Sequence, residues 1–190
     1  MVSQISPSAT KARRDAPNGV GEKAGERRLG GTEMALFLST YTNKIDKKGR
    51  VSVPAAFRAA LAGQNFNGFV AFRSYRLPAI EALDMSRMEA IAHGADRHAL
   101  YSDEHEDLST TIFADTAELA FDGEGRVMLP EILTSHASIS DMAAFVGQGR
   151  TFQIWEPGAF HRHQEEARAR AREQGMTLQL GGAGSRDGDV

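Results

Sequence analysis

The pattern of hydrophobic and polar residues along the chain predicts two copies of one small β-rich unit. In residues 40–53, β-branched and apolar residues alternate with polar ones on both sides of a short polar stretch, as in a strand, a tight turn and a strand. Residues 121–130 repeat segment 45–54, with an apolar residue, Asp, two variable positions, Gly-Arg-Val, a variable position, an aliphatic residue and Pro. One offset of 76 residues relates the two segments, and it also aligns Phe69-Val70 with Phe145-Val146. A repeat of this length indicates two tandem domains rather than solenoid units.

Six residues of the repeated segment are predicted to shape the turns: Asp46, Gly49, Pro54, Asp122, Gly125 and Pro130. An aspartate at the first turn position can accept hydrogen bonds from the backbone N–H groups ahead of it. Glycine suits the turn position that requires a positive φ. Each proline ends the second strand and suits the first turn of a helix, where its missing N–H is not needed. These residues are therefore interpreted as structural, and neither aspartate is expected to be catalytic.

The rest of each copy follows from the same kind of pattern. Helix formers predict a short helix over 54–61, and residues 130–136 continue as a weaker one. Strand-type residues return at 68–73 in the first copy, and at 144–147 and 151–155 in the second. Each copy is thus predicted to be β-turn-β, a short helix and β-turn-β. Pro78 is expected to end the strand region of the first copy.

Helices are predicted outside these units as well. Asp84 is placed to cap an amphipathic helix that begins at Met85, because apolar residues then recur at helical spacing. The acidic stretch 103–107 is expected to be a solvated helix or loop. Pro157 opens a final helix to about residue 174, dense in alternating Glu and Arg, as is usual for an exposed helix.

These patterns divide the chain into five parts: a disordered extension (1–33), domain 1 (40–87), a helical and acidic connector (88–115), domain 2 (116–159), and a C-terminal helix with a flexible tail (160–190). Residues 1–33 contain almost no large apolar side chains, so they cannot offset the entropy lost on folding. Two other interpretations of this extension remain open: a flexible basic arm that touches DNA, or an upstream assignment of the start codon.

The segment Asp-Lys-Lys-Gly-Arg-Val-Ser-Val-Pro-Ala-Ala-Phe-Arg (46–58), followed by the diverged Asp-Gly-Glu-Gly-Arg-Val-Met-Leu-Pro (122–130), resembles the MraZ family of bacterial transcription regulators. The resemblance covers roughly residues 34–155. It implies an α+β, mainly β fold, in which two AbrB-like swapped-hairpin repeats form a pseudo-twofold β-barrel with flanking helices.

The resemblance also implies that the chain is a DNA-binding transcriptional regulator. The DNA-binding residues that it implies are Arg50, Lys48, Lys47, Arg58 and Arg126. Arginine offers a planar fork for guanine O6 and N7, whereas lysine suits phosphate. We therefore assign Arg50 to base readout, and Lys47, Lys48 and Arg58 to contacts with the DNA backbone. From the chemistry alone, Arg50 and Arg126 could equally be salt-bridged residues of the strands.

The partners implied by the resemblance are promoter DNA and further copies of the chain. Family members are expected to recognise short G-rich direct repeats ahead of the division and cell wall gene cluster, repressing that cluster and their own gene. They are also expected to form rings of several subunits. The chain is expected to be cytoplasmic and nucleoid-associated, with no cofactor, metal, membrane or small-molecule substrate.

Charge and composition qualify this picture. The net charge is −3, and residues 34–190 hold 16 basic and 21 acidic groups, so the whole chain lacks the basic signature of a nucleic-acid binder. The first turn nevertheless forms a local basic cluster with Lys44, Lys47, Lys48, Arg50 and Arg58, whereas the second contains Glu124 and only Arg126 as a base. Cysteine is absent, which fits a reducing compartment, and no apolar run approaches the length of a membrane span.

Enzyme interpretations find little support in the sequence. The chain has no P-loop and no Gly-x-Gly-x-x-Gly motif. The stretch 122–125 is reminiscent of a calcium loop, but Leu133 stands where a bidentate Glu is required. His161 and His163 lie two apart on a predicted helix and point to different faces. The alternative that remains is an AbrB-like protein-interaction module, an antitoxin or scaffold, which the acidic second turn favours.

Overall fold

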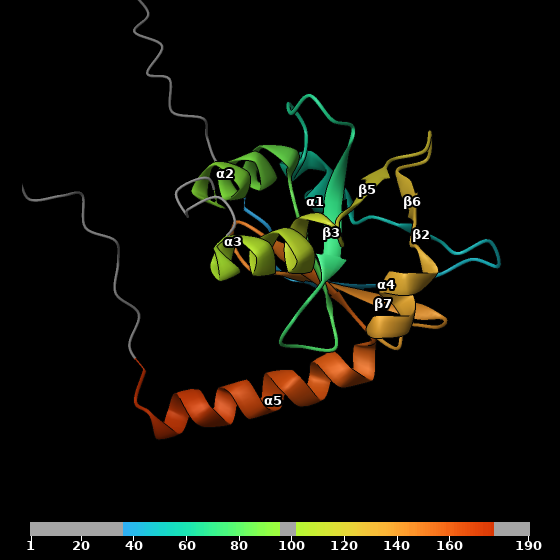
Figure 1. Ribbon diagram of the computed structural model, residues 1–190. Coiled ribbons are helices and arrows are strands. Elements are labelled where there is room, and N and C mark those ends of the chain that lie inside the picture. The colour runs from blue at the N-terminus through green and yellow to red at the C-terminus, as the bar shows by residue number, and fades with distance from the viewer. Residues whose placement is uncertain (1–35, 96–101, 177–190) are drawn as a thin grey trace, which may run out of the picture. The chain divides into compact units, whose positions relative to one another are not determined.

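The computed structural model describes residues 36–95 and 102–176, which all fall within one compact unit. Its strands are β1 (Thr40–Lys44), β2 (Arg50–Ser52), β3 (Gly68–Arg73), β4 (Ile80–Leu83), β5 (Ala117–Ala120), β6 (Arg126–Met128), β7 (Met142–Gly147) and β8 (Phe152–Trp155). Its helices are α1 (Ala55–Ala60), α2 (Met85–Ala95), α3 (Asp103–Leu108), the π-helix η1 (Ser109–Phe113), α4 (Glu131–His136) and α5 (Pro157–Glu173) (Figure 1). The predicted mixed α+β class is confirmed. The predictions for residues 1–33 and for the flexible tail beyond α5, 177–190, lie outside the described residues.

Six strands form one antiparallel sheet in the order β1-β7-β8-β4-β3-β5. The first strand of each copy pairs with the other copy, because β1 lies against β7 and β5 lies against β3. If each strand is replaced by its counterpart in the other copy, the result is the same strand order read from the opposite edge of the sheet. The topology therefore has pseudo-twofold symmetry about the central β4–β8 pair, and neither copy contains a complete sheet of its own.

The strands that the structure describes form no closed barrel, so this part of the predicted pseudo-twofold β-barrel is wrong. The sheet is open, with β1 and β5 at its edges, and β2 and β6 pair with each other as a separate two-stranded ribbon. Each ribbon strand has only three residues, and Pro54 or Pro130 follows soon after it. Proline has no N–H to donate to a ladder, so neither strand of the ribbon continues past its proline.

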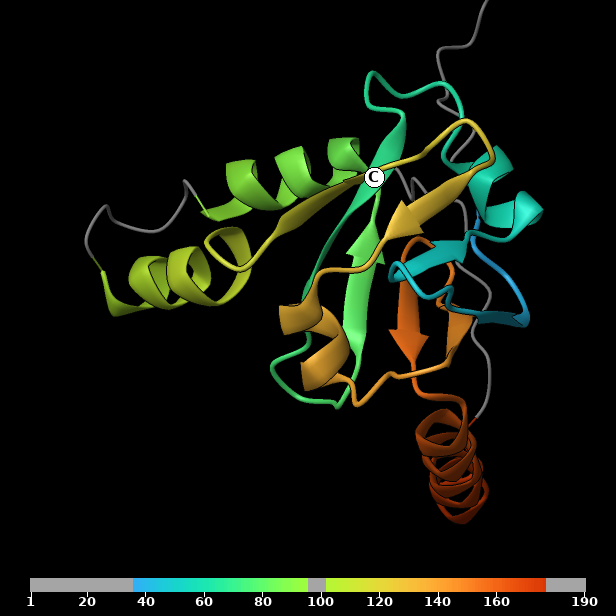
Figure 2. The ribbon, with the colours of Figure 1, turned by 90° about the vertical axis from the view of Figure 1, so that its right-hand side faces the viewer.

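The alternation of residues along the sheet strands separates a main core from two smaller clusters. Inward residues such as Phe69, Phe145 and Phe152 join the β2–β6 ribbon, α1 and α4 in the main core. On the opposite face, side chains of α2 and η1 pack against Val70 and its neighbours, and those of α5 pack against a cluster around Trp155. In Figure 2, α2 and α3 lie to one side of the sheet, and α5 lies at one end of it. The ribbon therefore rests on the inner core, and its other face is left toward solvent.

The structure confirms the predicted helix cap at Asp84 and contradicts the predicted end of the strands at Pro78. Asp84 accepts a hydrogen bond from the Arg87 N–H at 2.8 Å, which confirms the predicted cap of α2. Pro78 does not end the strands of the first copy, because β4 follows it and forms the centre of the sheet. The prediction failed because proline excludes a strand only at its own position, and the chain turns at Pro78 and re-enters the sheet.

Candidate nucleic-acid interface

The β2–β6 ribbon presents one buried face and one outward face. Val51 lies opposite Val127, and these two side chains are 0% and 1% exposed in the main core. Side chains alternate along a strand, so the flanking positions point outward. Arg50 lies opposite Met128, and Ser52 lies opposite Arg126. The two arginines thus lie diagonally across one outward face.

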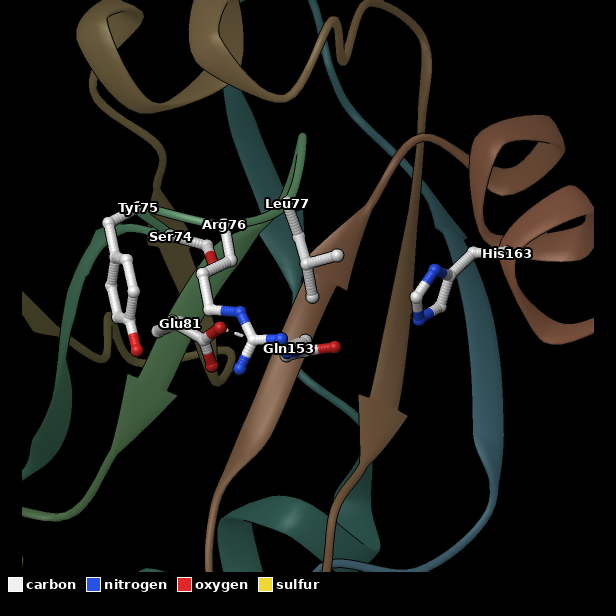
Figure 3. Close-up of a pocket in the computed structure, with 7 residues that line it drawn as sticks. All are labelled: Ser74, Tyr75, Arg76, Leu77, Glu81, Gln153 and His163. Carbon is white, nitrogen blue, oxygen red and sulfur yellow. Dashed lines mark hydrogen bonds between the residues drawn. The ribbon is translucent and has the colours of Figure 1, made fainter. Parts of the chain in front are cut away.

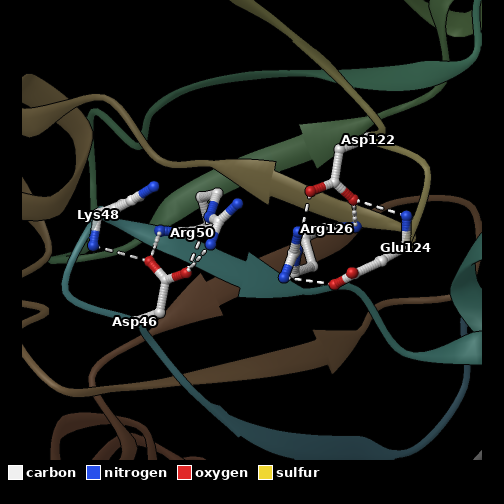
Figure 4. Close-up of polar contacts among 6 residues, drawn as sticks. All are labelled: Asp46, Lys48, Arg50, Asp122, Glu124 and Arg126. Carbon is white, nitrogen blue, oxygen red and sulfur yellow. Dashed lines mark hydrogen bonds and ion pairs between the residues drawn. The ribbon is translucent and has the colours of Figure 1, made fainter.

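The first turn holds Arg50 by a set of bonds to one carboxylate (Figure 4). Asp46 Oδ1 accepts hydrogen bonds from the backbone N–H groups of Lys48, at 2.8 Å, and Arg50, at 3.0 Å. Asp46 Oδ2 accepts a bond from Arg50 Nε at 2.8 Å and forms an ion pair with Nη2 at 2.6 Å. The Asp46 carboxylate thus bonds to the backbone of the turn, and it also orients the guanidinium.

The second turn repeats this arrangement around Asp122. Its Oδ1 accepts from the backbone N–H groups of Glu124, at 2.9 Å, and Arg126, at 3.0 Å, and its Oδ2 accepts from Arg126 Nε at 2.8 Å. One contact has no counterpart in the first turn, because Arg126 Nη1 also pairs with the Glu124 carboxylate. Arg126 is therefore more fully neutralised than Arg50.

The bonds in both turns favour the ionised aspartates. The pKa of Asp46 falls from its ordinary value of 3.8 to about 2, first because of the Arg50 backbone N–H and then because of the Arg50 side chain. The pKa of Asp122 falls in the same way, to about 2, with Arg126 in the corresponding role. Hydrogen bonds to the charged form of a carboxyl group lower its pKa, so both turns carry a carboxylate at neutral pH.

Backbone bonds fix each turn to the opposite strand. Gly49, with φ +78°, accepts a hydrogen bond through its carbonyl from the Leu129 N–H at 3.1 Å. Gly125, with φ +73°, accepts one from the Val53 N–H, also at 3.1 Å. Both glycines thus have the positive φ that glycine adopts without strain. The two turns and the ribbon are therefore joined by hydrogen bonds into one platform.

The predicted lysines and Arg58 lie around this platform. Lys47 and Lys48 are exposed at the tip of the first turn. Arg58, on α1, donates from Nε to the Val53 carbonyl at 3.2 Å, and its side chain lies against Gly125. The sequence grouped Arg58 with the first turn, whereas the structure places it beside the second. Arg58 thereby adds a positive charge where Asp122 and Glu124 are negative.

A hollow of about 380 Å³ lies between the sheet and α5 and is lined by Ser74, Tyr75, Arg76, Leu77, Glu81, Gln153 and His163 (Figure 3). Two of its polar side chains bond to each other, because Gln153 Nε2 donates to Glu81 Oε1 at 2.9 Å, and Gln153 Oε1 accepts from Trp155 Nε1 at 2.9 Å. His163 stacks on Trp155, with ring centroids 5.0 Å apart. These contacts stabilise the outer face of the sheet and resemble no catalytic constellation.

Across 36–95 and 102–176, no cluster of three or more His, Asp or Glu side chains could hold a metal ion. In the same described part of the chain, no helix has the length and apolar character needed to cross a membrane.

Two interleaved β-turn-β repeats, with Arg50 and Arg126 placed diagonally on one face of the shared ribbon, define the class of the protein as a duplicated, interleaved hairpin fold. Comparison with known proteins gives the family. A model described as "MraZ protein, putative antitoxin-like" matches residues 36–75 and 112–180, and the chain belongs to the MraZ family. The family consists of transcriptional regulators, so the chain is a transcription regulator and not an enzyme.

Individual relatives match most of this chain and most of their own length. The transcriptional regulator MraZ of Gluconacetobacter diazotrophicus is 44% identical over 149 residues, which is 77% of this chain and 94% of that protein. The proteins of the same name from Rickettsia akari and Pelagibacter ubique are 45% and 44% identical over 145 and 136 residues. These alignments cover 76% and 72% of this chain, and 97% and 88% of the two relatives.

Proposed function

We propose that the chain regulates transcription by binding double-stranded DNA in a sequence-specific manner, with the β2–β6 ribbon in the major groove. The observation that carries this proposal is the pair of outward arginines on a ribbon fixed at both turns. A two-stranded β-ribbon fits the major groove of B-DNA, and arginine pairs with guanine O6 and N7 there. Lys47 and Lys48, exposed beside Arg50, provide phosphate contacts.

The ion pair to Asp46 is compatible with base readout. A guanidinium has five N–H donors, and the contacts between Arg50 and Asp46 use Nε and Nη2. The edge that includes Nη1 can still approach a base, and the Arg50 side chain is 29% exposed. The carboxylate thus holds the guanidinium in one orientation before DNA arrives, which reduces the entropy lost on binding.

The targets follow from the family resemblance. We propose that the operator consists of short G-rich direct repeats ahead of the division and cell wall gene cluster, and that binding represses that cluster and the chain's own gene. We further propose a homo-oligomeric ring in the cytoplasm, associated with the nucleoid. Repeated DNA boxes bound by repeated subunits would raise the affinity through effective concentration.

A titration against DNA tests this function. Fluorescently labelled DNA from the region upstream of the gene is compared with a scrambled duplex at two salt concentrations. We expect preference for the promoter and weaker binding at the higher salt, because phosphate contacts release counterions. Arg50→Ala should abolish the preference, while Arg150→Ala, which removes an exposed arginine outside the ribbon, should retain it. Equal binding to both duplexes by the unaltered chain would refute the proposal.

A protein-interaction module, an AbrB-like antitoxin or scaffold, is the second candidate function. The pairing of Arg126 with both Asp122 and Glu124 favours it, because it weakens the positive charge of the second turn. The description of the matching family model also includes the term antitoxin-like. Purification of the chain with a stoichiometric protein partner, together with equal affinity for promoter and scrambled DNA, would support this candidate.

A further inference from the structure

Met128 is an apolar residue on the otherwise polar outward face of the ribbon. Its side chain is 59% exposed, whereas Val127 beside it is buried in the core. The pseudo-symmetric position in the first copy holds Ser52, which is also exposed. The exposure of Met128 therefore follows from the strand pattern, and its apolar character distinguishes the two halves of the ribbon.

The register places Met128 beside the proposed base-reading arginine. Arg50 and Met128 are direct partners across β2 and β6. Such partners lie about 4.5–5.5 Å apart in an antiparallel pair, and successive base pairs lie about 3.4 Å apart along DNA. If Arg50 contacts one base, Met128 meets an adjacent base pair in the same groove.

The chemistry of methionine restricts what it can recognise there. Its thioether has no N–H or O–H to donate to a phosphate or to a base acceptor. The thymine 5-methyl group is the apolar feature of the major groove, and apolar side chains contact it. Met128 therefore matches a thymine better than any other base.

We propose that Met128 is a specificity-determining residue that contacts the methyl group of a thymine next to the base bound by Arg50. This inference rests on the proposed function, since it requires the ribbon to enter the major groove. The Met128 side chain would also give the two halves of the ribbon preferences for different bases. Ser52, opposite Arg126, has a hydroxyl group that can donate or accept a hydrogen bond, and it has no apolar surface of comparable size.

Selection from a randomised duplex pool tests the proposal. The unaltered full chain and Met128→Ser, which introduces the residue of the first copy, are used in parallel selections. Ile132→Ser is the matched control, because Ile132 is 56% exposed but lies on α4, outside the ribbon. We expect one thymine adjacent to a guanine in the sites selected by the unaltered chain and by Ile132→Ser. Met128→Ser should no longer select that thymine.

Replacing that thymine by deoxyuridine then removes only the methyl group. The affinity of the unaltered chain should fall about fourfold, the effect of one buried methyl group, and that of Met128→Ser should not change. The same thymine preference in both proteins, or equal affinity of the unaltered chain for thymine and deoxyuridine sites, would overturn the role of Met128 alone. A Met128→Ser protein with altered oligomeric mass would also overturn it, because Met128 would then lie in a subunit contact. Failure of the unaltered chain to select any sequence would refute the proposed function itself.

Discussion

The side chain of Arg58 lies against Gly125, although the two residues belong to different copies of the repeat. A Cβ atom at Gly125 would approach Arg58 Cζ to 2.7 Å and Cδ to 2.8 Å. Arg58 also donates to the Val53 carbonyl, and the Val53 N–H donates to the Gly125 carbonyl. The absence of a side chain at Gly125 thus provides the space in which Arg58 reaches the second turn.

Substituting the two turn glycines separates their backbone role from this contact. Gly49→Ala and Gly125→Ala should each lower the unfolding free energy by about 1–2 kcal/mol, since both positions have positive φ. Only Gly125→Ala should also displace Arg58, because the nearest atom to a Cβ at Gly49 lies 4.0 Å away. Chemical denaturation measures the first effect, and DNA titration measures the second.

The same contact predicts non-additive effects on DNA binding. Gly125→Ala should reduce the affinity for DNA as Arg58→Ala does, and the double variant should lose no more than either single one. Gly49→Ala is the matched control for strain in a turn. Additive losses in the double variant would show that Gly125 affects binding by a route other than Arg58.

A charge-reversal variant tests the asymmetry of the two turns. Glu124 occupies the position that Lys48 has in the first copy, and it forms an ion pair with Arg126. Glu124→Lys should release Arg126 and add a cation, so DNA affinity should rise. The slope of log affinity against log salt should steepen by about 0.9 for one added phosphate contact. A Glu124→Gln control should raise the affinity less, and an unchanged salt slope in the lysine variant would place the second turn away from DNA.

Acid should weaken the fold through the two turn aspartates. Their pKa values fall from 3.8 to about 2 in the folded chain. A carboxyl group with a depressed folded-state pKa contributes stability above its unfolded pKa, and that contribution disappears as the pH falls through the folded pKa. The unfolding free energy should therefore decrease between about pH 4 and pH 2. Asp46→Asn and Asp122→Asn should each flatten this decrease, as measured by denaturant titration across that range.

An exposed carboxylate outside the turns provides the control for the acid experiment. Asp107 is exposed on α3, so Asp107→Asn should retain the pH dependence of the unaltered chain. If all three variants lost stability in parallel with the unaltered chain, the bonds to Arg50 and Arg126 would not be the source of the effect.

These local features could be predicted because they depend on neighbours within a few residues. Asp46 bonds to Lys48 and Arg50, and α1 begins directly after Pro54. The position of Arg58 could not be predicted in this way, since Gly125 lies far along the sequence and reaches α1 only when the repeats interleave. Likewise, the residue pattern of β1 gives no sign that its partner is β7.

The open sheet also could not be predicted from the sequence. The family resemblance implied a barrel. The observed pairing of the strands depends on strand lengths that only the packed structure determines. The sequence left open that Arg126 is salt-bridged, but it did not identify Glu124 as a partner, although both residues lie in the predicted turn. The position of Glu124, two residues before Arg126 in the sequence, was the signal that could have predicted this ion pair. The DNA contacts of Arg50, Lys47, Lys48, Arg58 and Arg126 stay predictions.

The final prediction concerns Phe57, which connects the two copies through the core. This side chain is 1% exposed, and its ring centroid lies 5.1 Å from that of Phe152 and 6.4 Å from that of Phe145. Phe57→Ala should lower the unfolding free energy by about 3–5 kcal/mol, as is typical when a buried phenylalanine is truncated. Circular dichroism during denaturant titration measures this change.

The unfolding transition should remain single in that variant, because strands of both copies share one sheet and one core. Ile132→Ala is the control, since Ile132 is 56% exposed and its truncation should cost no more than about 0.5 kcal/mol. Two resolved transitions in Phe57→Ala, with only one of them shifted, would show that the copies fold independently. A single transition at lower denaturant concentration would show that the interleaved strands make the duplicated chain one cooperative unit.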